Sequence, residues 1–277
     1  MNESFKKLAK PYQIWLYILA LFPVVVMFGL MFFSTEGISF DEASFKLGNF
    51  SYLLEVATLQ ALGNSFIYAF ITTFLTIILG YMVAYRIFRS RLTNKFIILV
   101  ILILPMWSNL LLRTQALGNI MEPNNILSNL FGRIGINLSI NILGKPIGVL
   151  VGLTITYLPF MVLPIYTSLE KIDFALEEAA LDLGATELQK FWKVVFPLSI
   201  KGIITGSILV FLPSLSGFAI PEILGKSNIL FIGNLIEQAF RNMRYYEGSI
   251  YAIIILIIIF AALMIINKVD KEGEILL

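Results

Sequence analysis

Cysteine and histidine are both absent from the 277 residues of this sequence. Without cysteine the chain can form no disulfide bond and offers no thiolate nucleophile. Without histidine it has neither a Ser-His-Asp triad nor an imidazole ligand for a metal ion. Charged residues are also scarce, at 14% of the chain, whereas an ordinary soluble domain has about 25%. The net charge of only +2 does not favour a nucleic-acid partner. These absences argue against most enzymes and against nucleic-acid binding.

Apolar residues are abundant instead, at 58% of the sequence. One core in a domain of this size cannot bury that many apolar side chains, so the composition predicts an integral membrane protein. Six runs without a charged residue approach or exceed the length that a helix needs to cross about 30 Å of hydrocarbon. These runs are 11–35, 56–85, 96–112, 146–169, 202–221 and 248–267. They are continuously apolar rather than alternating, which predicts an all-α fold with six transmembrane helices.

Two of these runs, the third and the first, differ from the others in length or in the residues that flank them. The third is the shortest, at 17 residues, and we expect Lys95 to extend it by placing its ammonium group at the membrane interface. The first follows three lysines, as a signal peptide would. Its apolar core is longer than the usual roughly 7–15 residues, and no small-x-small cleavage site follows it. We therefore expect it to be an uncleaved first helix.

The distribution of lysine and arginine between the loops predicts the orientation of the helices. With the amino terminus inside, 13 basic residues fall on the inner side and 7 on the outer side, so we expect both termini in the cytoplasm. Residues 1–55 are predicted to form a cytoplasmic N-terminus, the first transmembrane helix and the first outer loop. Residues 56–267 form the main transmembrane domain, with a cytoplasmic loop at 170–201, and residues 268–277 form a cytoplasmic tail.

The loop at 170–201 is too long for a simple turn, and its polar residues predict two short helices. Asp173 is a good N-cap for the first helix, and Gly184 is suited to end it because glycine has no Cβ penalty in the left-handed region. Thr186 and Gln189 have the spacing of a capping box at the start of the second helix. Pro197 is expected to mark the end of that helix.

The spacing in this loop resembles that of a known family. A charged residue and two alanines are followed, after three residues, by a glycine, and after nine more by an apolar stretch that ends in proline. The residues of this pattern are Glu178, Ala179, Ala180, Gly184 and Pro197. The pattern resembles the EAA loop of type I ABC-importer permeases, which have a MetI-like fold. It departs from the family only in having Val194 for isoleucine and Phe196 for leucine. The flanking text, at 158–173 and 182–186, is similar to the PotB family of spermidine/putrescine permeases.

The resemblance implies a permease subunit of an ATP-driven importer that brings polyamines across the cytoplasmic membrane of a prokaryote. It implies that the first short helix docks against an ATPase subunit. The residues expected to couple to the ATPase are Glu177, Glu178, Ala179, Ala180, Asp182, Gly184 and Pro197. The implied partners are a second permease of the PotC kind, two ATPase subunits of the PotA kind and an extracytoplasmic polyamine-binding protein of the PotD kind, in a lipid bilayer. ATP and Mg²⁺ would be used by the ATPase subunits, so this chain is expected to be no enzyme and to bind no cofactor or metal.

Other interpretations stay open at this point. The same kind of permease could carry an iron complex, a phosphonate or thiamine, since the EAA loop does not depend on the cargo. The first short helix could instead rest on the membrane surface. A stand-alone carrier or channel is disfavoured, because none of the six runs contains the ionisable residue that proton-coupled carriers place near the midplane. The string at 225–227 is no phosphate-binding loop, because Ile220 stands where the first glycine is required.

The fifth run contains the best candidates for the lining of a substrate path. A proline, two hydroxyls and a glycine interrupt it, and such interruptions are tolerated where a helix lines a cavity or packs against protein. These residues are Pro213, Ser214, Ser216 and Gly217. A polyamine needs carboxylates or aromatic faces for its ammonium groups. The candidates are Glu222 at the outer mouth and Trp107, Tyr157 and Phe218 as wall aromatics, although aromatic residues also serve as interface anchors.

Overall fold

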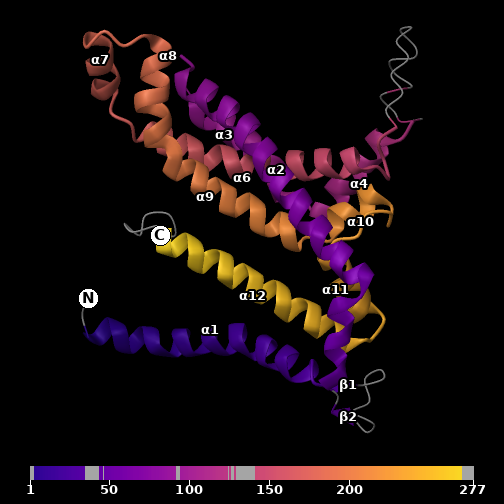
Figure 1. The fold of residues 1–277 in the computed structure, drawn as a ribbon. Coiled ribbons are helices and arrows are strands. Elements are labelled where there is room, and N and C mark those ends of the chain that lie inside the picture. Colours follow the sequence, from indigo (N-terminus) through magenta and orange to yellow (C-terminus); the bar gives the residue numbers. More distant parts are fainter. Residues whose placement is uncertain are drawn as a thin grey trace.

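The computed structural model describes residues 3–34, 44–45, 47–91, 94–123, 125, 128 and 141–269. Nearly all of this part of the chain is helical (Figure 1). Five helices are long and apolar enough to cross a membrane. They are α1 (Glu3–Leu30), α2 (Val56–Arg89), α6 (Pro146–Glu170), α9 (Phe196–Ser216) with the short helical segments that precede it, and α12 (Tyr245–Val269). They correspond to the first, second, fourth, fifth and sixth predicted runs, which confirms the all-α class. The orientation of the termini stays a prediction.

The third predicted run is not one straight helix. It forms α3 (Lys95–Ile103) and a 3-10 turn, η2 (Leu104–Trp107), and the chain then turns by 96° into α4 (Leu110–Met121). Counted as one broken span, this pair brings the total to six. The break has a local cause, since Pro105 lies in the turn and Asn109 caps α4 by accepting a hydrogen bond from the N–H of Leu111 at 2.8 Å. The expectation of a single 17-residue helix at 96–112 was therefore wrong.

The prediction that Pro197 ends the second short helix was also wrong. From Glu187 to Ser216 the chain is one continuous helix, made of α8 (Glu187–Lys190), a π-helical turn, η3 (Phe191–Val195), and α9. Proline lacks the N–H that an α-helix would use at that position. The π turn shifts the ladder just before it, so that the N–H of Phe196 bonds to the carbonyl of Phe191, five residues back. The helix accommodates Pro213 as well and ends only at Gly217.

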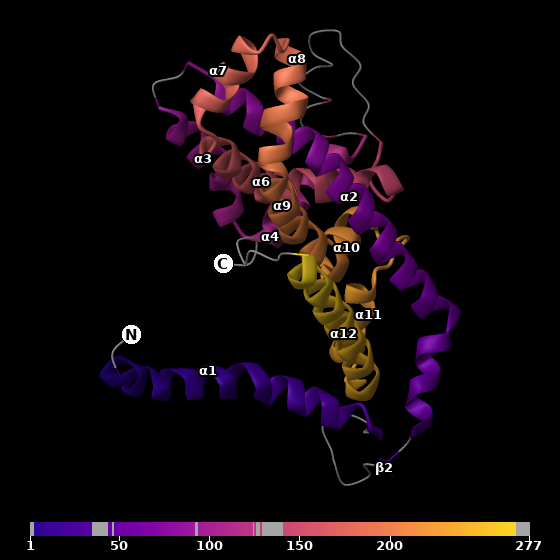
Figure 2. The same cartoon turned by 60° about the vertical axis from the view of Figure 1, so that its left-hand side comes forward.

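The first helix stands apart from the others. After α1, a two-residue strand β1 (Phe33–Ser34) pairs antiparallel with β2 (Ser44–Phe45), and a 3-10 segment η1 (Leu47–Leu54) leads into α2. Only the end of α1 packs inward, where Met31 meets Ile250 and Ile253 of α12. The rest of α1 extends away from the bundle (Figure 2) and exposes Trp15 and other large apolar side chains, as a lipid-facing helix would. Most of the predicted first outer loop lies outside the described residues.

The core is built where α2 and α9 press against α6. Met161 of α6 is fully buried and faces Gly80 of α2 and Gly206 of α9. A Cβ atom at Gly80 would lie 2.7 Å from the Cγ of Met161, and one at Gly206 would lie 2.7 Å from its Sδ. Small residues that let helices approach closely are the usual means of helix association in lipid, where apolar burial drives little. Glycine at these two positions therefore sets the spacing of the three central helices.

The last elements lie at the far end of α9 from α8 (Figure 1). Short helix α10 (Ala219–Gly225) packs against α4 and α6, and α11 (Ile232–Arg241) leads into α12. Lys226 and Ser227 have positive φ values of 48° and 59°, so the 225–227 string forms a tight turn between α10 and α11. Helix α12 extends two residues into the predicted tail at 268–277, and the remainder of that tail lies outside the described residues.

Replacement of Gly202 by alanine tests the contact between α9 and α6. A Cβ atom there would lie 2.7 Å from the Cβ of Ser168 and 2.9 Å from the Cα of Ile165, so backbone would have to move. We expect Gly202→Ala to cost about 1–3 kcal/mol and to lower the melting temperature of the detergent-solubilised chain. Gly63→Ala is the matched control, because nothing lies within 4 Å of a Cβ atom at Gly63. Equal melting temperatures for the two variants would contradict the close packing.

Candidate functional site: a capped helix and a pocket at the opposite end

The first short helix of the loop at 170–201 is α7 (Phe174–Asp182), and both its ends are capped as predicted. At its start the Asp173 carboxylate accepts a hydrogen bond from the N–H of Ala175 at 2.9 Å. At its end Gly184 has a φ of +84°. The N–H of Ala185 bonds to the carbonyl of Ala180 at 3.0 Å, and that of Gly184 bonds to Leu181 at 2.9 Å. These bonds form a Schellman motif, so α7 has defined ends although it is only nine residues long.

The predicted capping box at the start of α8 is also present. The Thr186 hydroxyl accepts from the N–H of Gln189 at 3.2 Å, and the Gln189 side chain accepts from the N–H of Thr186 at 3.0 Å. Only Ala185 separates this box from Gly184, the glycine that ends α7. The corner between α7 and α8 is thus held by backbone and side-chain bonds on both sides, and it forms a rigid projection at one end of the bundle (Figure 1).

The predicted coupling residues divide between two faces of α7. Four are exposed: Glu178, Ala179, Asp182 and Gly184. Ala180 is half-buried and Pro197 lies on the exposed side of the continuous helix beyond η3. Large apolar side chains surround the exposed carboxylates, and Leu183 is 89% exposed. An apolar surface of this kind, rimmed by charge and outside the spans, is typical of a protein interaction site.

Glu177 behaves differently from its neighbour Glu178, because it is only 3% exposed. Its carboxylate forms an ion pair with Arg89 at the end of α2, and Lys190 of α8 lies 3.5 Å away. Glu177 therefore points into the protein and holds α7 in place. Neither Arg89 nor Lys190 stood out in the sequence except as a basic loop residue. The available signal was an arginine in the last turn of a helix, where cations are favoured.

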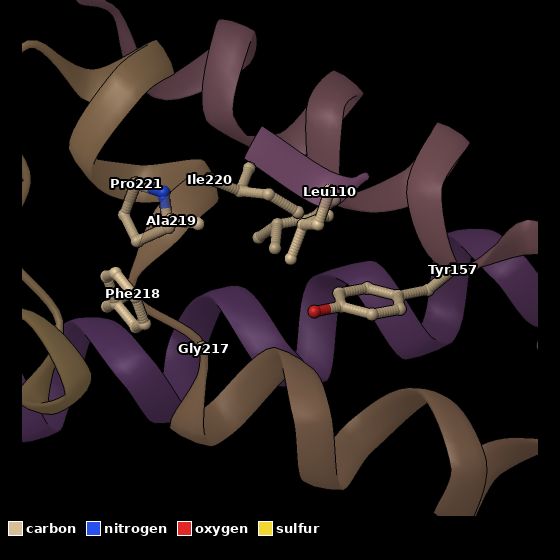
Figure 3. A pocket seen from close by; sticks show the side chains of 8 residues that line it. Leu110, Tyr157, Gly217, Phe218, Ala219, Ile220 and Pro221 are labelled. Atoms are coloured by element: carbon tan, nitrogen blue, oxygen red, sulfur yellow. The ribbon is translucent and has the colours of Figure 1, made fainter. Parts of the chain in front are cut away.

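A small apolar pocket of about 100 Å³ lies where α9 ends, at the opposite end of the helices from α7 (Figures 1 and 3). Its lining residues are Leu110, Leu153, Tyr157, Gly217, Phe218, Ala219, Ile220 and Pro221. The Tyr157 hydroxyl lies beside Gly217 and donates a hydrogen bond to the carbonyl of Pro213 at 3.3 Å. Of the predicted path residues, the structure thus brings Tyr157, Gly217 and Phe218 together around one pocket, with Pro213 in contact through its carbonyl.

The remaining candidates lie elsewhere. Trp107 is 90% exposed at the break between α3 and α4 and does not line the pocket. Ser216 donates to the carbonyl of Leu212 at 3.0 Å within its own helix. The Ser214 hydroxyl is buried and has no hydrogen-bond partner among the residues that the structure describes.

Glu222 follows the pocket residue Pro221 on α10, and its environment is polar rather than ionic. One carboxylate oxygen accepts a hydrogen bond from the Asn234 side chain at 2.9 Å. Asn234 is fully buried. It also donates to the carbonyl of Phe218 at 3.0 Å and accepts from the N–H of Phe231 at 3.0 Å. Asn234 thus links the pocket residue Phe218, the carboxylate and the start of α11, a role that sequence reasoning missed. The described residues hold no group of three carboxylates that would suit a metal ion.

Comparison with known proteins places this arrangement among transport proteins. A family model described as "Binding-protein-dependent transport system inner membrane component" matches residues 76–269. The spermidine/putrescine transport system permease protein PotB of Escherichia coli (strain K12) is 34% identical, over 91% of this chain and 92% of that protein. PotB of Haemophilus influenzae is 31% identical, over 98% and 96% of the two chains. A bacterial ABC transporter involved in the import of the acidic polysaccharide alginate is similar in structure, with a TM-score of 0.78 over 98% and 96% of the chains at 16% identity. This likeness confirms the expected fold.

Proposed function

Because this chain belongs to the family of binding-protein-dependent transport system inner membrane components, we propose that it is a permease subunit of an ATP-driven polyamine importer. Its family and its apolar helices make it a multi-pass inner-membrane protein. One observation carries the coupling role. Helix α7 is capped at both ends, anchored on one face by Glu177, and exposes Glu178 and Leu183 on the other. A short rigid helix with such a face is suited to seat in a groove of another subunit.

The proposed machine has five subunits. A second permease of the PotC kind would complete the pathway, two ATPase subunits of the PotA kind would bind the α7 corners, and a polyamine-binding protein of the PotD kind would deliver cargo from outside. The small volume of the pocket, about 100 Å³, supports the need for a second permease, because ligand sites usually occupy about 300–1,000 Å³. ATP and Mg²⁺ would be bound by the ATPase subunits, and this chain would contribute movement rather than chemistry.

The proposed transport cycle takes its order of events from the family, and the positions of these two regions suit it. Closure of the ATPase pair on ATP would displace α7, and the central helices would carry that displacement to the other end of the bundle. There the chain breaks at Asn109 and at Gly217, which are the positions where segments can turn without losing further helical hydrogen bonds. Turning of α4 and α10 at these breaks would change the pocket that they both line. ATP hydrolysis would then restore the first state.

The polyamine cargo is supported by relatives and by side-chain chemistry. The two PotB proteins named above are spermidine/putrescine transport system permease proteins. Glu222 has an amide rather than a cation as its hydrogen-bond partner, so its negative charge is not neutralised by an ion pair in the described part of the chain. The phenol of Tyr157 and the ring of Phe218 lie at the adjacent pocket. A carboxylate beside aromatic faces is suited to an ammonium group.

A permease for another small solute, such as an iron complex, a phosphonate or thiamine, would use the same α7 corner, so the cargo needs a direct test. Cells that express this chain with its proposed partners should accumulate labelled spermidine, and unlabelled putrescine should compete. The purified complex should contain an ATPase. Uptake by this chain alone, without any ATPase, would instead identify a stand-alone carrier.

Replacement of Glu222 by glutamine should weaken spermidine uptake at low substrate concentration by about tenfold, in line with the loss of one charge-assisted contact. The glutamine oxygen can still accept the hydrogen bond from Asn234, so assembly should be unchanged. Glu122→Gln is the matched control, because that carboxylate is half-exposed and lies 3.6 Å from Lys226. If both variants transport like the parent protein, Glu222 is no part of the polyamine path.

Replacement of Gly184 by valine should abolish cargo-stimulated ATP hydrolysis in the assembled complex. A β-branched residue is strained at a φ of +84°, so the Schellman motif would open and α7 would lose its defined end. Gly184→Asn is the control, because asparagine tolerates the left-handed region, and it should retain most of the stimulation. Normal coupling in the valine variant would remove the case for α7 as the docking helix.

A further inference from the structure

Two side chains of α7 are held by a helix to which α7 is not joined in sequence. Its covalent neighbours are α6, through residues 171–173, and α8, through residues 183–186. Its buried carboxylate, however, is bound by Arg89, which is the last residue of α2 and lies 88 positions away in the chain. The Glu177 side chain is 4% exposed, whereas that of Arg89 is 29% exposed. Removal of the arginine is therefore costly, because the carboxylate that stays behind is buried.

An aromatic contact forms a second attachment between α2 and α7. Phe88, which precedes Arg89, stacks on Phe174 in the first turn of α7 with ring centroids 5.7 Å apart and planes within 4°. Phe174 and Glu177 are three residues apart, so they share one face of α7. Two adjacent residues of α2 thus hold two side chains of the same face, one by stacking and one by charge. Such a two-point attachment resists rotation as well as separation.

The side chain of Arg89 is itself held in position. Its guanidinium lies over the rings of Tyr85 and Phe88, with the Cζ atom 5.4 Å and 5.1 Å from the two centroids. Its Nε donates to the Tyr85 hydroxyl at 3.3 Å. Lys95 then closes the end of α2 by donating to the carbonyl of Phe88 at 2.6 Å. The arginine is therefore an ordered part of α2 rather than a mobile surface charge.

The second cation near Glu177 has its own partner. Lys190 of α8 lies 2.7 Å from Glu187 and 3.5 Å from the Glu177 carboxylate. The four charges balance, and they join α7 to two long helices, because Arg89 ends α2 and Lys190 lies in the continuous helix from Glu187 to Ser216. Helix α2 extends over 34 residues, from beside η1 to the α7 corner (Figure 1).

We propose that Arg89 is a positioning residue that makes α7 and α2 move as one body, so that α2 carries the movement of a docked ATPase toward the outer end. The proposal rests on the function proposed above and names the helix through which that function is exerted. It predicts that loss of the Arg89 charge disconnects ATP hydrolysis from cargo without removing the docking face, because Glu178 and Leu183 lie on the other side of α7.

The test uses the full complex with its ATPase subunits and a polyamine-loaded binding protein. In Arg89→Met the complex should still assemble, but stimulation of ATP hydrolysis by the loaded binding protein should fall by about tenfold, a typical size for coupling between sites. Arg89→Lys keeps the charge and should retain at least half of the stimulation. Arg86→Met is the matched control, because Arg86 lies in the same turn of α2 and is exposed. It should behave like the parent protein.

Several outcomes would overturn the proposal. Equal stimulation in Arg89→Met and Arg86→Met, equal loss in Arg89→Lys and Arg89→Met, or loss of ATPase binding in Arg89→Met would each do so. If Arg89→Met fails to fold, the double variant Arg89→Met with Glu177→Met removes both charges, and it should assemble yet stay uncoupled. Full coupling in that variant would count against the pair. A parent complex that shows no stimulation at all would refute the proposed function instead.

A distance measurement tests the joint movement directly. The chain has no cysteine, so spin labels can be attached to Arg91→Cys beyond α2 and Ala175→Cys on α7, both of which are exposed positions. The distance between the labels should be the same in the nucleotide-free and ATP-bound complexes when Arg89 is present. It should change or broaden in Arg89→Met. A clear change between the two states with Arg89 intact would show that α7 moves independently of α2.

Discussion

The close approach of α2 and α9 to α6 at Met161 is the contact on which the rest of this structure depends. In lipid, apolar burial does not drive helices together, so association relies on tight packing at small residues. Gly80 and Gly206 supply that packing from opposite sides of one side chain. The result is a block of three long helices with no room for sliding. A displacement at one end of these three helices is therefore transmitted to the other end.

Each end of this block carries a different kind of structure. At the α7 end, helix caps and ion pairs hold the corner between α7 and α8 in place. At the other end the helices break at Asn109 and Gly217, and the pocket lies between segments that follow the two breaks. Irregular backbone at membrane depth is tolerated only where it is buried in protein or lines a cavity. A rigid α7 corner at one end and broken helices at the other suit a protein that a partner moves at one end and that changes the shape of a substrate path at the other.

The few charged residues lie at the two ends of the helices rather than in their apolar middle. The six apolar runs contain none. The well-buried carboxylates Glu177 and Glu247 lie at or beyond the ends of the spans, and each has an arginine partner, Arg89 at one end and Arg244 at the other. Charges at these depths fix how helix ends sit relative to one another, because a misplaced partner would leave a carboxylate buried and unpaired. An external source of energy is consistent with apolar runs that contain no Asp, Glu, Lys or Arg.

The membrane class, five of the spans and the caps of the α7 corner can be predicted from the amino-acid sequence. These features depend on length, on continuous apolar composition and on short spacings, such as that between Thr186 and Gln189, and all of these can be counted along the chain. Local spacing could not determine that Pro197 lies within a continuous helix, because the π turn that accommodates it depends on how the following turns pack. It also could not predict the 96° turn in the third run, although Pro105 marked the place.

Helix packing determines which of two adjacent carboxylates, Glu177 and Glu178, is buried in an ion pair and which is exposed. Glu177 and Glu178 have the same chemistry and neighbouring positions, so no pattern along α7 separates them. The end of α2 separates them, since Arg89 and Phe88 come from a segment 88 residues away and cover one face of α7. The same holds for Glu222, whose buried amide partner Asn234 comes from another helix. The role of each of these side chains depends on which residues of other helices contact it. Those contacts are made when the helices pack together, so the local sequence that forms each helix does not determine them.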